Sequence, residues 1–127
     1  MQRTEIDPWG WAAPLGYAQA VAMGGTVHVA GQTAVDEAGA PQHPDDMRAQ
    51  MALVLDNLDA VLAAAGAGWG DVVRLGVHAT DVDAAFGAWD LLGARLGGAK
   101  PAITLLGVAR LARPELSIEI EATAMLR

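Results

Sequence analysis

Apolar and polar residues alternate with two different periods along this chain, and each change of period marks a structural element. In residues 17–23 and 26–35 the period is two, which is typical of β-strands. Gly24-Gly25 lies between these runs and suits the two-residue turn of a hairpin. Residues 1–16 show no period and contain prolines and glycines, so we expect them to form a surface arm.

The middle of the chain has the three-to-four spacing of a helix that buries one face. Its apolar positions run from Met47 to Ala65. Asp45 is expected to cap the start of this helix, and Gly66 to end it. By the same criteria the following elements are a strand at 71–80, a helix at 82–96, and strands at 101–111 and 115–126.

The predicted order is therefore β-β-α-β-α-β-β, within a single domain that covers residues 1–127. This order suits an α+β fold in which both helices cover one face of one sheet. The other face would stay open. Since exposing apolar surface to water costs roughly 25 cal/mol per Å², we expect partner chains to cover that face.

The last predicted strand carries two carboxylates within the run ELSIEIEATA. Alternation places Glu119 and Glu121 on one face of the strand, and Ile118 and Ile120 on the other. If the isoleucines pack under the helices, both glutamates point to the open face. A carboxylate on that face must form an ion pair, be hydrated or serve in a functional site.

Composition and charge disfavour several classes of function. Hydrophobic residues make up 53% of the chain and charged residues 18%, which is typical of a compact globular protein. The net charge of −7 and the scattered basic residues argue against nucleic acid as a partner. With no cysteine, no membrane-spanning run and no apolar leader segment, the sequence predicts a cytoplasmic protein that binds no membrane.

The remaining chemistry-bearing residues point to neither a metal nor a cofactor. His28, His43 and His78 lack the spacing of metal ligands, and the glycines form no phosphate-binding or dinucleotide-binding motif. His78 is the histidine that we place nearest a cleft. Trp9 and Trp11 either anchor the arm to a neighbouring chain or cap a pocket, and we favour anchoring.

Six short segments, taken in order, resemble the Rid family, the reactive intermediate deaminases also called the YjgF family. The resemblance runs from about Tyr17 to the C-terminus, through GYAQAV, GGTVHVAGQ, LDNLDAVLAAAG, GDVVRLGVHATD, KPAITLLGVARL and IEIEATA. It implies a chorismate-mutase-like fold, a homotrimer whose sheets line a central barrel, and sites in the clefts between subunits. Family deaminases hydrolyse imines or enamines to 2-keto acids and ammonia without a cofactor of their own.

One departure from the family pattern changes the expected substrate. In family deaminases an arginine follows the PA of the strand at 101–111 and holds the substrate carboxylate with its planar fork of donors. This chain has Ile103 at that position, and Ala30, Trp89 and Leu105 replace polar residues of the family. The resemblance therefore implies a weakly polar substrate-binding cleft formed by Ala30, Gly31, Trp89, Ile103 and Leu105.

Glu119 and Tyr17 are the candidate catalytic residues that the resemblance retains. In the family, the glutamate that matches Glu119 helps to hold and activate the attacking water, with a backbone carbonyl near the Leu105 position as a second support. Burial in an apolar cleft raises the pKa of a carboxyl group and suits it to acid–base chemistry. The alternatives are that Glu119 pairs with an arginine across an interface and that Tyr17 only packs. For Glu121 we expect a structural role.

We therefore expect a trimeric, cofactor-free enzyme that hydrolyses or isomerises a small imine, enamine or enol-type intermediate more apolar than an amino-acid imine. Two alternatives stay open. One is an ordinary 2-imino acid deaminase that works at a reduced rate, with the carboxylate held by another group. The other is a binding or scaffold protein without chemistry. The acidic charge disfavours the older family label of endoribonuclease.

Overall fold

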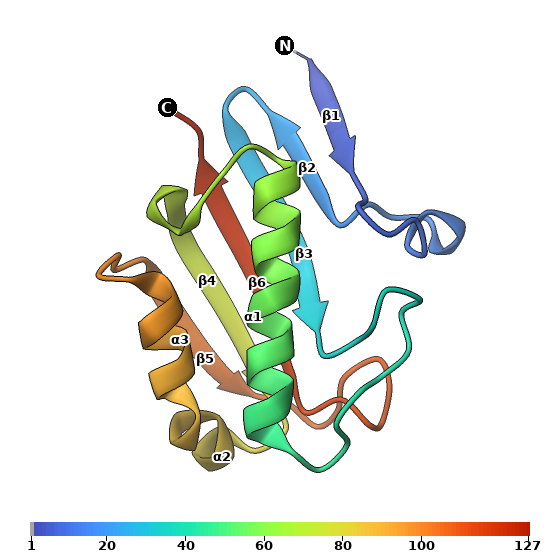
Figure 1. Ribbon diagram of the computed structural model, residues 1–127, viewed down its shortest axis with the longest axis vertical. Coiled ribbons are helices and arrows are strands. Elements are labelled where there is room, and N and C mark those ends of the chain that lie inside the picture. The colour runs from blue at the N-terminus through green and yellow to red at the C-terminus, as the bar shows by residue number, and fades with distance from the viewer. Residues whose placement is uncertain (1) are drawn as a thin grey trace.

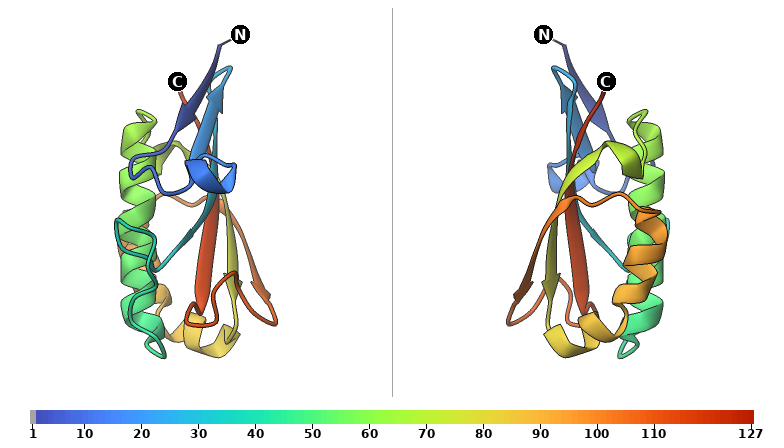
Figure 2. Two further views of the ribbon diagram at one scale, coloured as in Figure 1. Left: turned by 90° about the vertical axis from the view of Figure 1, so that its right-hand side faces the viewer. Right: turned by 90° about the vertical axis from the view of Figure 1, so that its left-hand side faces the viewer.

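The computed structural model describes residues 2–127 and contains one six-stranded sheet with its helices on a single face (Figures 1 and 2). The strands are β1 (Arg3–Ile6), β2 (Ala20–Met23), β3 (Thr26–Thr33), β4 (Val72–Ala79), β5 (Ala102–Gly107) and β6 (Ile118–Met125). The helices are α1 (Met47–Ala64), α2 (Val82–Gly87) and α3 (Trp89–Leu96), with short 3-10 helices η1 (Ala13–Leu15) and η2 (Trp69–Asp71). The predicted α+β class is confirmed.

The order of strands in the sheet is β1-β2-β3-β6-β4-β5, so the last strand of the chain lies between β3 and β4. β4 and β5 are parallel and are connected through α2 and α3, whereas the other neighbouring strands are antiparallel. The pairing of β6 with β3 is what brings the end of the chain next to the N-terminal hairpin (Figure 1).

Alternation along β6 decides which residues enter the core. Ile118, Ile120 and Ala122 are buried under the helices, while Glu119 and Glu121 are half-buried on the opposite face. The predicted orientation of this strand is confirmed. Helix α1 supplies the covering layer with a buried stripe of Gln50, Met51, Val54, Leu55, Leu58, Val61 and Leu62.

The N-terminal arm differs from its prediction, because part of it joins the sheet. Residues Arg3–Ile6 form the edge strand β1, which pairs with β2. Three of the four β1 residues are exposed, so the strand has almost no apolar face and its sequence shows no period of two. Its order comes from backbone hydrogen bonds to β2, which side-chain patterns do not reveal. β2 itself begins at Ala20 rather than at Tyr17.

The second predicted helix, at 82–96, is in fact two helices. Ala88 separates α2 from α3 with φ −108° and ψ 6°, outside the helical range. Gly87 weakens the helix at this point. Arg48 of α1 holds the break by donating to the Gly87 carbonyl at 3.2 Å and to both carboxylate oxygens of Asp90 at 2.9 and 2.7 Å. The apolar period continues across the break, which is why the sequence predicts one helix.

The cap of α1 is shifted by one residue from its prediction. The Asp46 carboxylate accepts a hydrogen bond from the Ala49 N–H at 3.0 Å, whereas Asp45 has a φ of 61° and lies in the preceding turn. Two adjacent aspartates offer the same capping chemistry, so only the backbone path decides between them.

The ends of β5 and β6 also differ from their predictions, because residues 108–117 form a loop, here called the β5–β6 loop.

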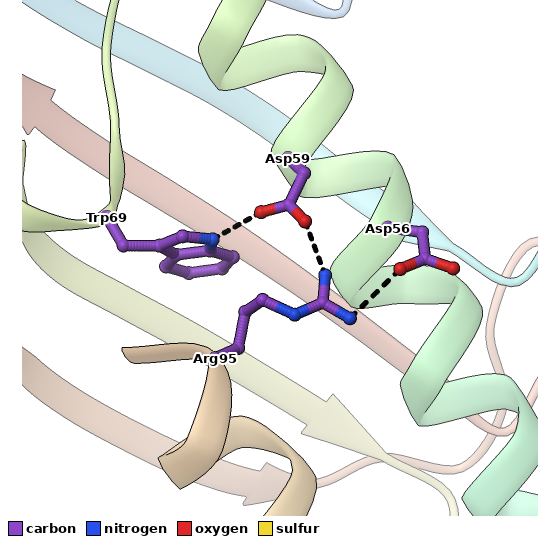
Figure 3. A network of polar contacts seen from close by, with 4 residues as sticks. All are labelled: Asp56, Asp59, Trp69 and Arg95. Carbon is purple, nitrogen blue, oxygen red and sulfur yellow. Dashed lines mark hydrogen bonds and ion pairs between the residues drawn. The ribbon is translucent and has the colours of Figure 1, made fainter. Parts of the chain in front are cut away.

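A polar cluster connects α1, α3 and η2 on the helical side of the sheet (Figure 3). Arg95 of α3 donates to Asp59 at 2.5 Å and to Asp56 at 2.9 Å, and the Trp69 indole N–H donates to the other oxygen of Asp59. The Arg95 side chain is only 29% exposed, so these charge-assisted bonds are partly shielded from water. The cluster fixes α3 against α1.

Candidate active site

A pocket of about 370 Å³ lies beside Glu119, where β3 ends and β6 begins. Its walls come from three segments that are distant in the sequence. These are the arm around η1, the end of β3 with the turn that follows it, and the β5–β6 loop with the start of β6. The residues used below are Trp11, Leu15, Tyr17, Gly31, Arg113, Leu116 and Glu119.

The side chain of Glu119 lies directly against the backbone of β3 at Gly31. A Cβ atom at Gly31 would lie 2.6 Å from Glu119 Cγ and 2.7 Å from its Oε1, so any side chain at residue 31 would force Glu119 to move. The pairing of β3 with β6 shifts register between Val29 and Gln32, a bulge that contains Ala30 and Gly31. Glu119 therefore keeps its position in the pocket wall because residue 31 has no side chain.

The electrostatic environment of Glu119 favours its protonated form. Burial raises the pKa of Glu119 above its ordinary value, because desolvation penalises the carboxylate. His78, its cross-strand neighbour on β4, opposes this effect, and the negative charge of Glu121 adds to it. A carboxyl group whose pKa moves toward neutrality is suited to proton transfer.

Tyr17 and Trp11 form an aromatic corner of the same pocket. Their rings meet edge to face, with centroids 6.1 Å apart and an interplanar angle of 79°. Burial raises the pKa of Tyr17, and the negative charges of Asp7 and Glu119 add to the effect, so the hydroxyl is a hydrogen-bond donor at neutral pH. Trp11 lies over Gly39, where a Cβ would be 3.0 Å from the indole. Within this chain Trp11 thus lines a pocket.

The β5–β6 loop is held in place by Gln50, a residue that the sequence analysis missed. Gln50 is fully buried, and its amide N–H groups donate to the carbonyls of His43 at 3.1 Å and Glu115 at 2.8 Å. Its amide oxygen accepts from the Ser117 N–H at 2.8 Å. A signal was present in the sequence, because Gln50 lies on the apolar stripe of α1, where a polar residue needs buried partners.

A pair of buried side-chain amides, Gln19 and Gln32, supports the bulge in β3. Gln32 donates to the Gln19 side-chain oxygen at 2.8 Å and to the Ala30 carbonyl at 3.1 Å. The Ala30 N–H in turn donates to the Gln19 carbonyl at 2.8 Å. These bonds tie the strand that carries Gly31 to the segment that follows Tyr17, so two walls of the pocket are positioned together.

The predicted site residues fall into two groups in this chain. Tyr17, Gly31 and Glu119 line the pocket, and Ala30 adjoins it in the bulge. Ile103 and Leu105 pair in register with core residues of β4, so they face the helical side of the sheet, and Trp89 packs against the same core. The structure therefore does not bring Trp89, Ile103 or Leu105 into the Glu119 pocket of a single chain.

Comparison with known proteins shows where this arrangement belongs. Residues 11–126 match the family described as endoribonuclease L-PSP. The chain belongs to that family. A RutC family protein of Pyrococcus abyssi is 34% identical over 112 residues, which cover 87% of this chain and 87% of that protein. The resemblance to the Rid/YjgF family is thereby confirmed.

Solved structures of the L-PSP family share the fold along the whole chain. A member of the YjgF/YER057c/UK114 family from Mycobacterium tuberculosis is 30% identical, with a TM-score of 0.85 and coverage of 98% of this chain and 100% of that one. A Rid family protein from Yersinia pestis is 25% identical, with a TM-score of 0.89 and coverage of 98% and 100%. The expected Rid/YjgF fold is confirmed.

On the open face of the sheet, Glu121, the second carboxylate of β6, has partners within the chain. Glu121 Oε1 lies 3.8 Å from His78 Nε2, and Glu121 Oε2 lies 3.5 Å from a guanidinium nitrogen of Arg74. Gly76 makes room for it, since a Cβ there would be 2.8 Å from Glu121 Cγ. This pairing agrees with the structural role predicted for Glu121.

A larger hollow of about 530 Å³ lies between α1 and the loop after β3, with Trp9 in its wall. Asp36 there accepts hydrogen bonds from two backbone N–H groups of its own turn. Asn57 donates to two backbone carbonyls at the end of β3. Because these polar groups already have partners, we assign the chemistry to the Glu119 pocket instead.

Residues 2–127, which the structure describes, offer neither a membrane-spanning helix nor a cluster of metal ligands. No helix in this range is both long and apolar enough to cross a bilayer. Nor does the same part of the chain bring together three or more histidine, cysteine, aspartate or glutamate side chains that could hold a metal ion.

Proposed function

We propose that this chain is a cofactor-free enzyme that hydrolyses or isomerises a reactive imine, enamine or enol-type intermediate, with Glu119 as general acid and base. One observation carries the proposal. Glu119 is a half-buried carboxyl group with a raised pKa, held against the Gly31 backbone in a pocket that can admit a small organic molecule.

For an imine, the proposed reaction adds water across the C=N bond and releases ammonia. The Glu119 carboxylate takes a proton from water while the water oxygen bonds to the imine carbon. The protonated carboxyl group then gives that proton to the nitrogen, which completes a carbinolamine. Glu119 next takes the proton of the new hydroxyl group and passes it to the amino nitrogen, so the C–N bond breaks as the C=O bond forms, and a carbonyl compound and ammonia remain. The raised pKa makes Glu119 a stronger base than an ordinary glutamate, and the Tyr17 hydroxyl can donate a hydrogen bond to the substrate.

The proposal includes a homotrimer with the site between subunits. Two observations support an assembly of several chains. The residues expected at the site form two separate groups in one chain, so a site that contains both groups needs two chains. In addition, the open face of the sheet exposes large apolar side chains, with Leu106 at 52% and Met125 at 45%, and a partner chain would cover them.

The test replaces Glu119 with glutamine, which keeps the size of the side chain but cannot exchange a proton. We expect kcat for hydrolysis of imines generated in solution, followed by release of the carbonyl product, to fall by about 10²- to 10⁴-fold. Glu121→Gln is the matched control, two residues along the same strand, and should keep its activity. Full activity in Glu119→Gln would refute the assigned role, and intact ligand binding without any turnover in the wild type would favour a scaffold protein.

Two other functions are weaker candidates. The family description names an endoribonuclease, but the net charge of −7 disfavours an RNA substrate, whose phosphates require clustered cations. An ordinary 2-imino acid deaminase needs a cation for the substrate carboxylate, and Ile103 does not supply one. A specific observation keeps this second candidate in view, because a guanidinium lines the Glu119 pocket from another segment of the chain.

A further inference from the structure

The guanidinium belongs to Arg113, on the β5–β6 loop, and it lines the same pocket as Glu119. Its nearest carboxylate is that of Glu115, at 3.9 Å, and within residues 2–127 it donates no hydrogen bond to another protein group. The side chain is 57% exposed. A guanidinium carries five N–H donors in a fixed plane, so Arg113 has donors left for a ligand.

Three other arginines of the chain, one of them on the same loop, are engaged by protein groups. Arg48 binds both carboxylate oxygens of Asp90, and Arg95 binds two aspartates of α1. Arg110, three residues before Arg113, folds back onto the backbone carbonyls of its own loop at 3.1 and 3.4 Å. Arg113 therefore lines the pocket with a long ion pair to Glu115 but with N–H donors that no hydrogen bond within residues 2–127 uses.

The position of Arg113 is fixed by the loop that carries it. The Arg113 carbonyl accepts from the Leu116 N–H at 3.1 Å, and Leu116 is a buried residue that is only 3% exposed. The residues on either side of Leu116 are both bound by the Gln50 side chain, which donates to the Glu115 carbonyl and accepts from the Ser117 N–H. A cation on an anchored loop loses less entropy on binding a ligand than one on a free loop.

The remaining walls show what kind of molecule would suit this cation. Trp11, Leu15 and Tyr17 provide an aromatic and aliphatic surface, and Glu119 provides the proton-transfer group. An anionic ligand without a cation would place a second negative charge near Glu119, which is unfavourable. A cation, an apolar wall and a carboxyl group in one pocket complement a molecule with an anionic end, an apolar body and a reactive C=N or enol group.

We propose that Arg113 is the anion-binding residue of the Glu119 pocket and that the substrate joins a carboxylate to an apolar, ring-bearing body. Arg113 thus supplies, from the β5–β6 loop, the cation that is missing at Ile103. The inference rests on the proposed function of this pocket and narrows its substrates to molecules that carry an anionic group beside a bulky apolar or aryl body, for which an aryl 2-imino acid is the probe.

The first experiment measures binding rather than turnover. Calorimetry follows the binding of an aryl 2-keto acid, phenylpyruvate, and of its neutral amide to the wild type, to Arg113→Gln and to the control Arg110→Gln. We expect Arg113→Gln to weaken the binding of the keto acid about tenfold or more, which is the range of a charge-assisted hydrogen bond. The affinity for the amide should stay unchanged. Arg110→Gln should bind both as the wild type does.

Several results would overturn the inference. These are a wild type that does not bind the keto acid, an Arg113→Gln variant that binds it normally, or an equal loss for the acid and the amide. Thermal melting of each variant shows whether the fold is kept. Arg113→Lys keeps the charge but not the planar fork of donors, so its affinity for the keto acid should lie between those of the wild type and Arg113→Gln.

The second experiment separates this inference from the proposed function. Glu119→Gln should lose hydrolysis of the aryl 2-imino acid but still bind the keto acid through Arg113. If Glu119→Gln stays fully active while binding depends on Arg113, the catalytic role is wrong and the anion site stands. If hydrolysis depends on Glu119 but neither KM nor keto acid binding changes in Arg113→Gln, the anion site is wrong and the catalytic role stands.

Discussion

Replacing Gly31 with alanine tests whether the position of Glu119, and not only its presence, supports activity. The added Cβ would lie 2.6 Å from Glu119 Cγ, whereas carbon atoms in contact are normally about 3.5–4.0 Å apart, so one of them must move by roughly 1 Å. The side chain of Glu119 is the part that can move, because it is flexible and half-buried.

The expected effects on stability and activity differ in size. Rotation of one side chain relieves the overlap, so we expect the free energy of unfolding to fall by about 1–2 kcal/mol, at the lower end for an overpacked site. A displacement of about 1 Å at a reacting group lowers rates about a hundredfold. Gly31→Ala should therefore fold nearly normally and lose most of its kcat for imine hydrolysis.

Gly76→Ala is the matched control for this prediction. It would bring a Cβ to 2.8 Å from Glu121 Cγ on the neighbouring part of the sheet, and so it applies a similar overlap to the other carboxylate. Urea denaturation gives the stability of both variants, and release of the carbonyl product gives their kcat. Wild-type kcat in Gly31→Ala, or an equal loss in Gly76→Ala, would refute the idea that Gly31 positions a catalytic Glu119.

Two further predictions concern the carboxyl group and the loop. As the pH rises above 4.5, the ordinary pKa of a glutamate, the wild type should lose stability relative to Glu119→Gln, because the folded chain keeps the Glu119 proton to a higher pH than the unfolded chain. Melting temperatures of both proteins across a pH series measure this, and parallel curves would contradict it. Gln50→Leu should lower the free energy of unfolding by about 2–4 kcal/mol, because it leaves the Ser117 N–H and the Glu115 carbonyl unpaired in the interior. Urea denaturation checks this, and wild-type stability would show that the loop does not depend on Gln50.

Much of the fold follows from local periodicity in the sequence. The stripe of α1 and the alternation of β6 each identify an element and its buried face, because a helix and a strand repeat their side-chain directions every 3.6 and 2 residues. The same reasoning fails where order does not come from side-chain burial. β1 is held by backbone pairing, and the break at Ala88 depends on Arg48, which lies on another helix.

The sequence by itself determined the strand that carries Glu119, the face on which this residue lies and the resemblance that singled it out. Only the tertiary structure decided what surrounds it. Pairing of β3 with β6 sets Gly31 against Glu119, and the β5–β6 loop turns Arg113 into the pocket on a frame anchored by Gln50. Contacts between residues so far apart in the chain arise from strand order and loop path, and local spacing does not encode them.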